Sequence, residues 1–568
     1  MKRLLIDGIG PFFAREGRRR VNWSKVPFAD FEPRGRFDAA RFARVRPDFR
    51  RFAHTAASMG FNGITLDDIA HLSEQPGQSD AVRSLVRSYR EAYTPLFDDA
   101  AEAGLEVFLT ADVLSTPADD PVPPTPDDAL AAIGRAAEDL LDRFPPVAGF
   151  ILRLGECDGR DVRGVFRSRL ALRTPEQARR VIEGLLPVFA RRGRRLIVRT
   201  WTVGAHRLGD LQWNRDTYDA VFGGLDSPHL VVSMKFGESD FFRFLPLNNL
   251  FFRGPHAKIV ELQARREYEG SGMYPSFVGW DYERYLRELA AAPNVVGAWV
   301  WAQTGGWSIF RNRTFLDGSS VWNEINVAVT ARLVRDGASV EDAVERYGRE
   351  RWGAAAVPRL LRLLRLSDEV VKELLYIEPF ARRRLFFRRV RVPPLLSVYW
   401  DQILVNHALR KLMRCWVEDP EALPRQDRAS LAKIREMRAL AEQIGLPAGD
   451  LDFQYDTFEI LAAARDYYFG PYGPAIRNRL QSLAQAYRRR HRIRYTVRMD
   501  FSPFHFPRRR LRRVLSLWVR DRHNYRLLDR LLTIRIVSLL SPVWFLARRP
   551  GLARLTRRRA MGLDAVLR

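Results

Sequence analysis

Short apolar runs alternate with helix-like segments through roughly the first 310 residues, and this alternation leaves few folds open. It is typical of parallel βαβ units, in which a helix returns the chain after each strand. Eight such units predict a (β/α)8 TIM barrel, an α/β fold, over residues 1–316. We expect strands at 4–7, 61–68, 105–112, 149–156, 196–201, 230–235, 258–263 and 295–301, and helices at 48–59, 81–103, 127–143, 175–192, near Thr217 and at 281–292.

The eighth run indicates where a ligand would bind. It reads Val-Val-Gly-Ala-Trp-Val-Trp over 295–301 and continues through a Gly-Gly pair to Trp307. An apolar run that ends in a glycine turn carrying an indole is typical of a buried barrel strand leading into a sugar-binding loop.

The rest of the chain divides into two further parts. Residues 317–480 have helical periodicity, with Trp352, Leu360, Leu361 and Leu364 at helical spacing, and no strand pattern is evident. We therefore predict an α-helical domain that serves packing. Residues 481–568 form an Arg-rich segment, which we expect to be helical and amphipathic.

Charge is concentrated in that last segment. It holds 23 Arg and 4 Asp with no Lys or Glu, so +19 of the net +26 charge lies there. Arg clusters beside runs such as 514–519 and 534–546 suit a helix lying on an anionic membrane surface. A helical lid with solvated Arg side chains is the alternative. Nucleic acid would use the same charges, but the segment contains no recognised nucleic-acid module, so no specific nucleic-acid partner is expected.

Composition narrows the class of protein further. Hydrophobic residues make up 46% of the chain, enough for a large core, and Cys157 and Cys415 are too few for a disulfide framework. The N-terminal apolar run is too short for a signal peptide, and 531–547 is interrupted by Arg535 and Pro542. We expect a cytoplasmic protein, with peripheral association at the inner face of the membrane as an option; a homodimer stays open.

Charged and aromatic residues follow the predicted strands, where a barrel places its active site. Hydrolysis of a glycosidic bond needs an acid and a base or nucleophile on opposite faces of the sugar. Glu156, Asp240 and Glu267 lie in different sectors of one barrel mouth and could supply them. Alternatively, these carboxylates only pair with nearby basic side chains. The strand ends also carry Asp67, Asp68, Asp112, Arg153, Arg199, Lys235, Trp301 and Trp307.

The order of these motifs resembles glycoside hydrolase family 67, the α-glucuronidases, from about residue 50 to 353. The resemblance lies in Ala-Ala-Ser-Met-Gly-Phe-Asn-Gly-Ile-Thr-Leu-Asp-Asp (56–68), Gly-Phe-Ile-Leu-Arg-Leu-Gly-Glu-Cys-Asp-Gly (149–159), Leu-Ile-Val-Arg (196–199), Lys-Phe-Gly-Glu-Ser-Asp (235–240), Glu-Leu-Gln-Ala-Arg-Arg-Glu-Tyr-Glu-Gly (261–270), the segment through Trp307 and Trp-Asn-Glu-Ile-Asn (322–326).

The resemblance implies an inverting glycoside hydrolase that removes a terminal uronic or other acidic sugar from an oligosaccharide or polysaccharide. It implies Glu156 as the acid, Asp240 and Glu267 as the water-activating pair, and Arg153 with Arg199 as the carboxylate-binding pair. We also expect substrate contacts from Lys235, Trp23, Asp67, Asp68 and Trp307, and no metal or other cofactor.

Three features depart from the family pattern. Glu156 matches the family's acid only with a one-residue offset, so Asp158 is a rival. Arg153 stands where the family has Lys, and no β domain precedes the barrel. Two other functions remain open: a non-catalytic carbohydrate-binding barrel, and a membrane-surface protein of polysaccharide assembly.

Overall fold

The computed structural model describes residues 1–9, 13, 26–120, 122–155, 164–202, 205–302, 320–382, 384–387, 390–392, 398–399, 402–415, 417, 419, 422–501, 508–516 and 519–520. Four residues predicted to be in the site (Trp23, Glu156, its rival Asp158, and Trp307) lie outside this part of the chain, as do residues 521–568.

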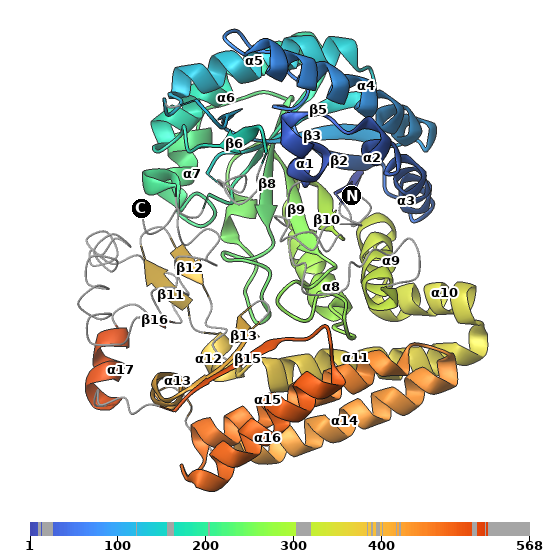
Figure 1. Ribbon diagram of the computed structural model, residues 1–568, viewed down its shortest axis with the longest axis vertical. Coiled ribbons are helices and arrows are strands. Elements are labelled where there is room, and N and C mark those ends of the chain that lie inside the picture. The colour runs from blue at the N-terminus through green and yellow to red at the C-terminus, as the bar shows by residue number, and fades with distance from the viewer. Residues whose placement is uncertain are drawn as a thin grey trace.

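Eight parallel strands close into a barrel, which confirms the predicted fold. The strands are β1 (Arg3–Asp7), β2 (Gly63–Asp67), β3 (Glu106–Asp112), β5 (Val147–Arg153), β7 (Arg195–Arg199), β8 (Leu230–Lys235), β9 (Ala257–Gln263) and β10 (Val295–Trp301). They follow one another around the barrel in chain order, and β1 pairs with β10 to close it (Figure 1). All eight expected strands are present.

Helices follow most of the strands, as expected. They are α3 (Arg46–Ser58), α4 (Asp80–Glu102), α5 (Pro126–Arg143), α6 (Pro175–Arg191), α7 (Arg215–Phe222) and α8 (Gly279–Leu289), with the short α1 (Phe28–Phe31), η2 (Pro33–Gly35) and α2 (Ala39–Ala43) before α3. Thr125 and Thr174 form capping boxes at the first residues of α5 and α6. Between β8 and β9 the described chain has only the 3-10 helix η5 (Asn249–Phe252). A second 3-10 turn, η4 (His206–Leu208), precedes α7.

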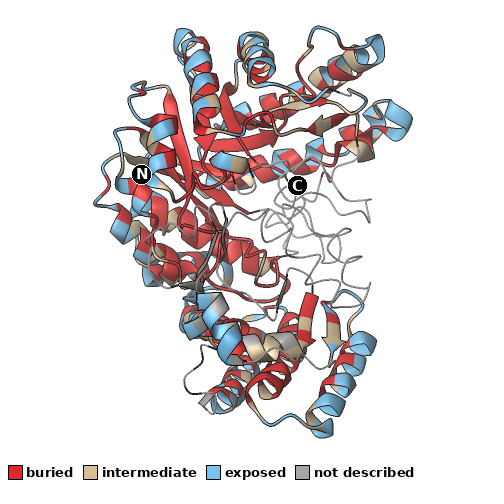
Figure 2. Ribbon diagram, turned by 90° about the vertical axis from the view of Figure 1, so that its left-hand side faces the viewer, coloured by how far each residue is buried: buried red, intermediate tan, exposed pale blue. Residues whose placement is uncertain are grey.

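The barrel strands are buried on both faces, because side chains fill the interior and helices cover the outside (Figure 2). Glycine allows close backbone approach at two points. A Cβ on Gly149 would collide with the backbone oxygen of Arg195, and one on Gly297 with that of Arg3. Both glycines lie beside register shifts in the barrel sheet. Strand pairing at these points therefore requires glycine.

The helical domain follows the barrel. Its helices are α9 (Val321–Asp336), α10 (Val340–Trp352), η6 (Ala354–Ala356), α11 (Val357–Val370), the π-helix η7 (Val371–Leu375), α12 (Glu378–Ala381), α13 (His407–Met413), α14 (Ala422–Ile444), α15 (Ala448–Phe469), α16 (Pro474–Arg490) and α17 (Arg508–Ser516). Helices α11, α14, α15 and α16 pack side by side below the barrel in Figure 1. Helix α16 passes through residue 481, where the sequence suggested that a separate segment begins.

Short strands occur where the sequence showed no strand pattern, and that expectation was wrong. They are β11 (Arg384–Phe387), β12 (Val390–Val392), β13 (Val398–Tyr399), β14 (Gln402–Asn406), β15 (Thr496–Asp500) and β16 (Val519–Arg520). In β11 and β12, aromatic and β-branched residues favour strands, but the Arg residues among them obscure the period-two pattern. Strand β14 pairs in parallel with β15, more than 80 residues later in the chain.

Arg243, in the loop after β8, connects the barrel to the helical domain. Its guanidinium donates to Glu269 and Asp281 of the barrel and to Asp368 of α11, at 2.8–3.2 Å. Tyr376 donates to Glu269 at 2.7 Å from the domain side. Burial disfavours the charge, but the three carboxylates raise the pKa of Arg243 well above its ordinary value. Among the described helices, none is long and apolar enough to cross a membrane.

Candidate active site

The carboxyl ends of the barrel strands bring together the charged residues singled out in the sequence. Asp112, Arg153 and Arg199 end β3, β5 and β7 and are in direct register across the sheet. Lys235 ends β8 opposite Glu261 of β9, and Trp301 ends β10 opposite Gln263. The residues at this mouth fall into four ion-pair clusters.

The first cluster joins Arg153 to two aspartates. Its Nε lies 2.6 Å from Asp112 Oδ1 and its Nη2 donates to Asp67 Oδ1 at 3.2 Å, with all three side chains at most 1% exposed. Thr110 and Ser168 donate hydroxyl hydrogen bonds to Asp67 and Asp112, respectively. Two predicted substrate-binding residues, Arg153 and Asp67, therefore bind each other.

Asp68 belongs to a second cluster. Its Oδ1 lies 2.6 Å from His71 Nδ1, and His71 Nε2 lies 3.2 Å from Glu32 Oε1. Burial alone would lower the pKa of His71, but the two carboxylates raise it to about 9. The His71 ring also stacks on Phe28, with centroids 3.4 Å apart. Asp68 thus binds a buried imidazolium beside the mouth.

Arg199 forms the third cluster with Glu261, inside the barrel. Its Nε and Nη2 donate to the two carboxylate oxygens at 2.9 and 2.8 Å, and Ser233 donates to the same carboxylate at 2.7 Å. Burial would raise the pKa of Glu261, but Arg199 holds it below its ordinary value. The guanidinium lies 5.4 and 5.0 Å from the ring centroids of Trp299 and Trp301. One edge of Arg199 therefore binds a carboxylate of the protein itself.

The fourth cluster contains Lys235, Asp240 and Glu267. Lys235 Nζ donates to Asp240 Oδ1 at 2.5 Å, and Tyr268 donates its hydroxyl hydrogen to Asp240 Oδ2 at 2.7 Å. Lys235 Nζ also lies 3.6 Å from the ring centroid of Trp201. The Asp240 side chain is 15% exposed, more than any of the carboxylates in the other three clusters.

Asp240 and Glu267 have opposite pKa shifts. Burial would raise the pKa of Asp240, but Lys235 and the hydrogen bonds hold it below its ordinary value. Burial raises the pKa of Glu267, and the negative charge of Asp240 adds to this, although Arg265, 3.2 Å away, opposes it. Paired carboxyls with diverging pKa values are the arrangement that acid–base catalysis uses.

The loop after β9 holds Glu267 in place. Arg266 has a left-handed φ of 49°, a strained conformation for a non-glycine residue. Its Nε donates to Glu269 at 3.0 Å, which binds Arg243 as well. The Glu267 amide donates to Gln263 Oε1 at 2.9 Å. The loop is therefore fixed at both ends, and Glu267 is buried next to Asp240.

Two buried donors beside this loop have no hydrogen-bond partner among the described residues: Gln263 Nε2 and Trp301 Nε1. Both belong to strand ends at the mouth. Buried donors are normally paired, so each of these two has a hydrogen to donate to a ligand oxygen. In the described part of the chain, no group of three His, Cys, Asp or Glu side chains could hold a metal ion.

Sequence reasoning missed several members of these clusters. Glu261, Arg265, Tyr268 and Trp201 were not assigned to the site. Glu261 gave a signal, since a charged residue inside the otherwise apolar run of β9 must face either the barrel interior or a partner. The other three depend on loop geometry, which no periodicity reports.

No known protein-family profile matches this chain, and no curated protein sequence matches it. The resemblance to family 67 therefore stays a prediction. Several solved structures have a similar backbone. One is a GH138 enzyme targeting pectin rhamnogalacturonan II, with 11% identity, a TM-score of 0.47, and coverage of 85% of this chain and 60% of that one.

Two other solved structures are comparable. CpGH84B has 10% identity, a TM-score of 0.40, and coverage of 78% of this chain and 71% of that chain. BtGH115A, a family GH115 4-O-methyl-α-glucuronidase with specificity for decorated arabinogalactans, has 12% identity, a TM-score of 0.42, and coverage of 92% and 62%. This chain thus spans less than two thirds of the length of two of the three. These likenesses concern the backbone, so the function is argued from side chains.

Proposed function

We propose that this chain is a glycoside hydrolase of the α-glucuronidase type, which removes a terminal acidic sugar with inversion at the anomeric carbon. The observation that carries the proposal is that the partly exposed Asp240 and the buried Glu267 follow adjacent strands and have opposite pKa shifts. An inverting hydrolase needs an acid on one face of the sugar and a base that activates water on the other, and these two carboxyls would supply the water-activating face.

The two carboxyls have different tasks in this mechanism. Asp240, held ionised by Lys235, orients the attacking water. Glu267 removes a proton from that water, because a base with a raised pKa is better matched to neutral pH. The water oxygen bonds to the anomeric carbon while the glycosidic C–O bond breaks. Glu156, or its rival Asp158, gives its proton to the leaving oxygen.

The charge of the substrate follows from the basic residues at the mouth. Arg153, Arg199, Lys235 and Arg265 end or follow four successive strands, and each lies beside a carboxylate. Arg199 holds Glu261 through its Nε–Nη2 edge, and we assign binding of the sugar carboxylate to this group of basic residues as a whole. The unpartnered Gln263 Nε2 and Trp301 Nε1 would then bind sugar oxygens.

A panel of terminal uronosides and neutral glycosides tests the proposal. We expect release of an acidic sugar, with the first-formed anomer inverted in the proton NMR spectrum. Asp240→Asn and Glu267→Gln should each lower kcat by orders of magnitude with a small change in KM. The variant Asp219→Asn, at an exposed pair with Arg253, is the control and should keep full activity. Retention of configuration, or full activity in either site variant, would overturn the mechanism.

Association with an anionic membrane is a second proposal, supported by the exposed arginines of α17. Arg509, Arg510, Arg512 and Arg513 are exposed on this helix, and Arg488–Arg490 end α16. Such clusters attract anionic headgroups. The hydrolase would then act at a membrane surface, in the trimming of a polysaccharide.

A further inference from the structure

A cavity of about 760 Å3 lies beside the barrel mouth, between the segments that follow β2 and β3. Its volume is in the range of ~300–1,000 Å3 that small-molecule sites occupy. Asp68 and Asp112 line it, and Asp112 also binds Arg153 at the mouth. The cavity therefore shares Asp112 with the first ion-pair cluster of the candidate active site, and it lies across the barrel from Asp240 and Glu267, which follow β8 and β9.

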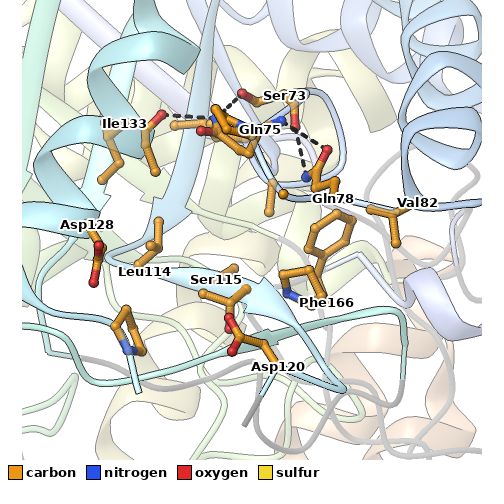
Figure 3. Close-up of a pocket in the computed structure, with 18 of the residues that line it drawn as sticks. Ser73, Gln75, Gln78, Val82, Leu114, Ser115, Asp120, Asp128, Ile133 and Phe166 are labelled. Carbon is orange, nitrogen blue, oxygen red and sulfur yellow. Dashed lines mark hydrogen bonds between the residues drawn. The ribbon is translucent and has the colours of Figure 1, made fainter. Parts of the chain in front are cut away.

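Fixed amides and hydroxyls line one part of the cavity. Gln75 Nε2 donates to Ser73 Oγ at 2.5 Å and to the Ala132 carbonyl at 3.1 Å. The backbone N–H of Gln75 donates to Gln78 Oε1 at 2.9 Å. Figure 3 shows these side chains on one side of the cavity, with Ser115 and Asp120 on the other. The bonds to Ser73 and Ala132 use both hydrogens of Gln75 Nε2. The second lone pair of each amide oxygen and one hydrogen of Gln78 Nε2 remain for a neutral polar ligand, and they are already oriented by the protein.

Thr116, in the short strand β4 (Ser115–Pro117) that pairs with β6 (Phe166–Ser168), provides an independent observation. It lines the cavity, is 9% exposed, and its hydroxyl has no hydrogen-bond partner among the described residues. A buried hydroxyl without a partner costs free energy. Its oxygen is covered in this structure, so Thr116 would donate to a ligand in the cavity only after its side chain turns toward that ligand.

Apolar surface alternates with these polar groups. Leu114, Ile133 and Phe166 line the cavity together with prolines such as Pro76 and Pro117. The Phe166 ring packs edge-on against His71, with centroids 4.8 Å apart, and is thereby fixed. A saccharide presents both C–H faces and hydroxyl edges, so it matches a wall of this mixed kind.

The charge of the lining disfavours an acidic ligand. Five aspartates line the cavity; Asp68 and Asp112 are paired with His71 and Arg153, which leaves Asp119, Asp120 and Asp128 against Arg135, the one basic residue of the described lining. Arg135 is already bonded to Gln75 Oε1 at 3.0 Å. A negative cavity repels carboxylate, sulfate and phosphate groups. A neutral saccharide carries none of these.

We propose that this cavity binds a neutral oligosaccharide, which forms the leaving-group side of the substrate. The first part stands on the cavity alone; the second part rests on the proposed hydrolase. The enzyme would then select a saccharide chain that is charged only at its terminal residue. The basic residues of the mouth would bind the terminal acidic sugar, and the cavity with its aspartates would bind the neutral sugars that follow it.

Binding without turnover tests the first part. The full chain is titrated calorimetrically with xylotetraose, cellotetraose, β-1,4-galactotetraose and, as the anionic counterpart, tetragalacturonate. We expect one-to-one binding of at least one neutral tetrasaccharide. Tetragalacturonate ends in an acidic sugar that the proposed active site would hold, so its binding should not depend on the cavity. Ala131→Trp, an exposed position of α5 that lines the cavity, should raise Kd at least about tenfold by filling it. Glu138→Trp, further along α5 and away from the cavity, should leave Kd unchanged.

Thr116→Val is a second variant whose interpretation does not depend on folding. The native hydroxyl has no protein partner in the described chain, so its removal should not lower the melting temperature, yet Kd should rise several-fold. If no neutral tetrasaccharide binds, if Ala131→Trp weakens tetragalacturonate as much as the neutral chain, or if Ala131→Trp leaves the Kd of the neutral chain unchanged, the cavity is not this subsite. Tetrasaccharide binding with no hydrolysis of any uronoside would instead contradict the proposed function and the leaving-group role, and leave the binding site in place.

Discussion

At the scale of single residues, two carboxyls of one site are made different by their neighbours. Asp240 accepts hydrogen bonds from the Lys235 ammonium group and the Tyr268 hydroxyl. The Glu267 carboxyl has Arg265 at 3.2 Å and lies in a more buried position. The first therefore stays ionised, and the second holds its proton to higher pH. This difference is what assigns them separate tasks.

The pH dependence of activity should report the Glu267 carboxyl. A base works only when deprotonated, so kcat/KM should fall as the pH falls through the pKa of Glu267, above the ordinary value of about 4.3. Arg265 lowers that pKa, so Arg265→Met should move the acidic limb to higher pH. Arg284→Met, on the exposed side of α8, should not move it. If kcat/KM falls at the same pH in Arg265→Met as in the wild type, a group other than Glu267 controls this fall.

A substitution at Arg199 can test the charge of the substrate while Glu261 keeps a cationic partner. Replacement by Ala would leave the buried Glu261 carboxylate without its cation. Arg199→Lys is therefore the better variant, because it keeps one positive charge but loses the bidentate geometry. A charge-assisted hydrogen bond contributes about 1.5–3 kcal/mol, so an acidic sugar should bind at least about tenfold more weakly.

A neutral sugar should bind Arg199→Lys as well as the wild type. Arg195→Lys, at the opposite end of the same strand, is the matched control. Equal losses for acidic and neutral sugars, or a wild-type preference for neutral hexosides, would contradict the assignment.

The sequence allowed these strand-end residues to be predicted because strand ends are read from apolar runs. It did not indicate which of them bind each other. Arg153 and Arg199 were expected to hold a substrate carboxylate, and the structure pairs them with Asp67, Asp112 and Glu261. Tyr268 contacts Asp240 only because the loop after β9 bends at Arg266. Contacts of this kind depend on tertiary geometry.

At the scale of elements, the barrel strands could be predicted and the small sheets could not. A buried parallel strand is a mostly apolar run, and all eight strands contain one, even β9 with Lys258 and Glu261. Strand β14 has its parallel partner β15 beyond the three long helices α14, α15 and α16, a pairing that local sequence cannot report. Helix α15 is buried on nearly all sides, because it packs between α14, α16 and the barrel loops.

The connection between barrel and helical domain should depend on Arg243. Arg243→Met would leave Glu269, Asp281 and Asp368 buried without that cation, at a cost of about 3–5 kcal/mol in the free energy of unfolding. Urea unfolding followed by circular dichroism measures this loss. Arg287→Met, whose side chain is 74% exposed, should change stability by less than about 0.5 kcal/mol. Equal stability of the two variants would mean that apolar packing alone joins the domains.

At the scale of the whole molecule, most of the net positive charge lies outside the candidate active site. The candidate site pairs its cations with carboxylates, while +19 of the +26 net charge lies in residues 481–568. Within the described part of that segment, Tyr487, Tyr495 and Val497 are buried in the helical domain, whereas the arginines of α17 are exposed. The start of the segment is therefore part of the folded domain, and its surface charge is available to a partner.

Membrane association should therefore respond to the α17 arginines and not to charge in general. Each basic residue near an anionic leaflet contributes about 1 kcal/mol, so replacing Arg509, Arg510, Arg512 and Arg513 by Gln should weaken binding by roughly two to three decades. The matched control replaces Arg287, Arg346, Arg349 and Arg351, four exposed arginines elsewhere, and removes the same charge. Sedimentation with phosphatidylserine vesicles at low and high salt measures the effect, and hydrolysis of a small uronoside should be equal in both variants. If the wild type stays in the supernatant at low salt, or if both variants lose binding equally, the exposed arginines of α17 are a solvated helix face and the membrane proposal is wrong.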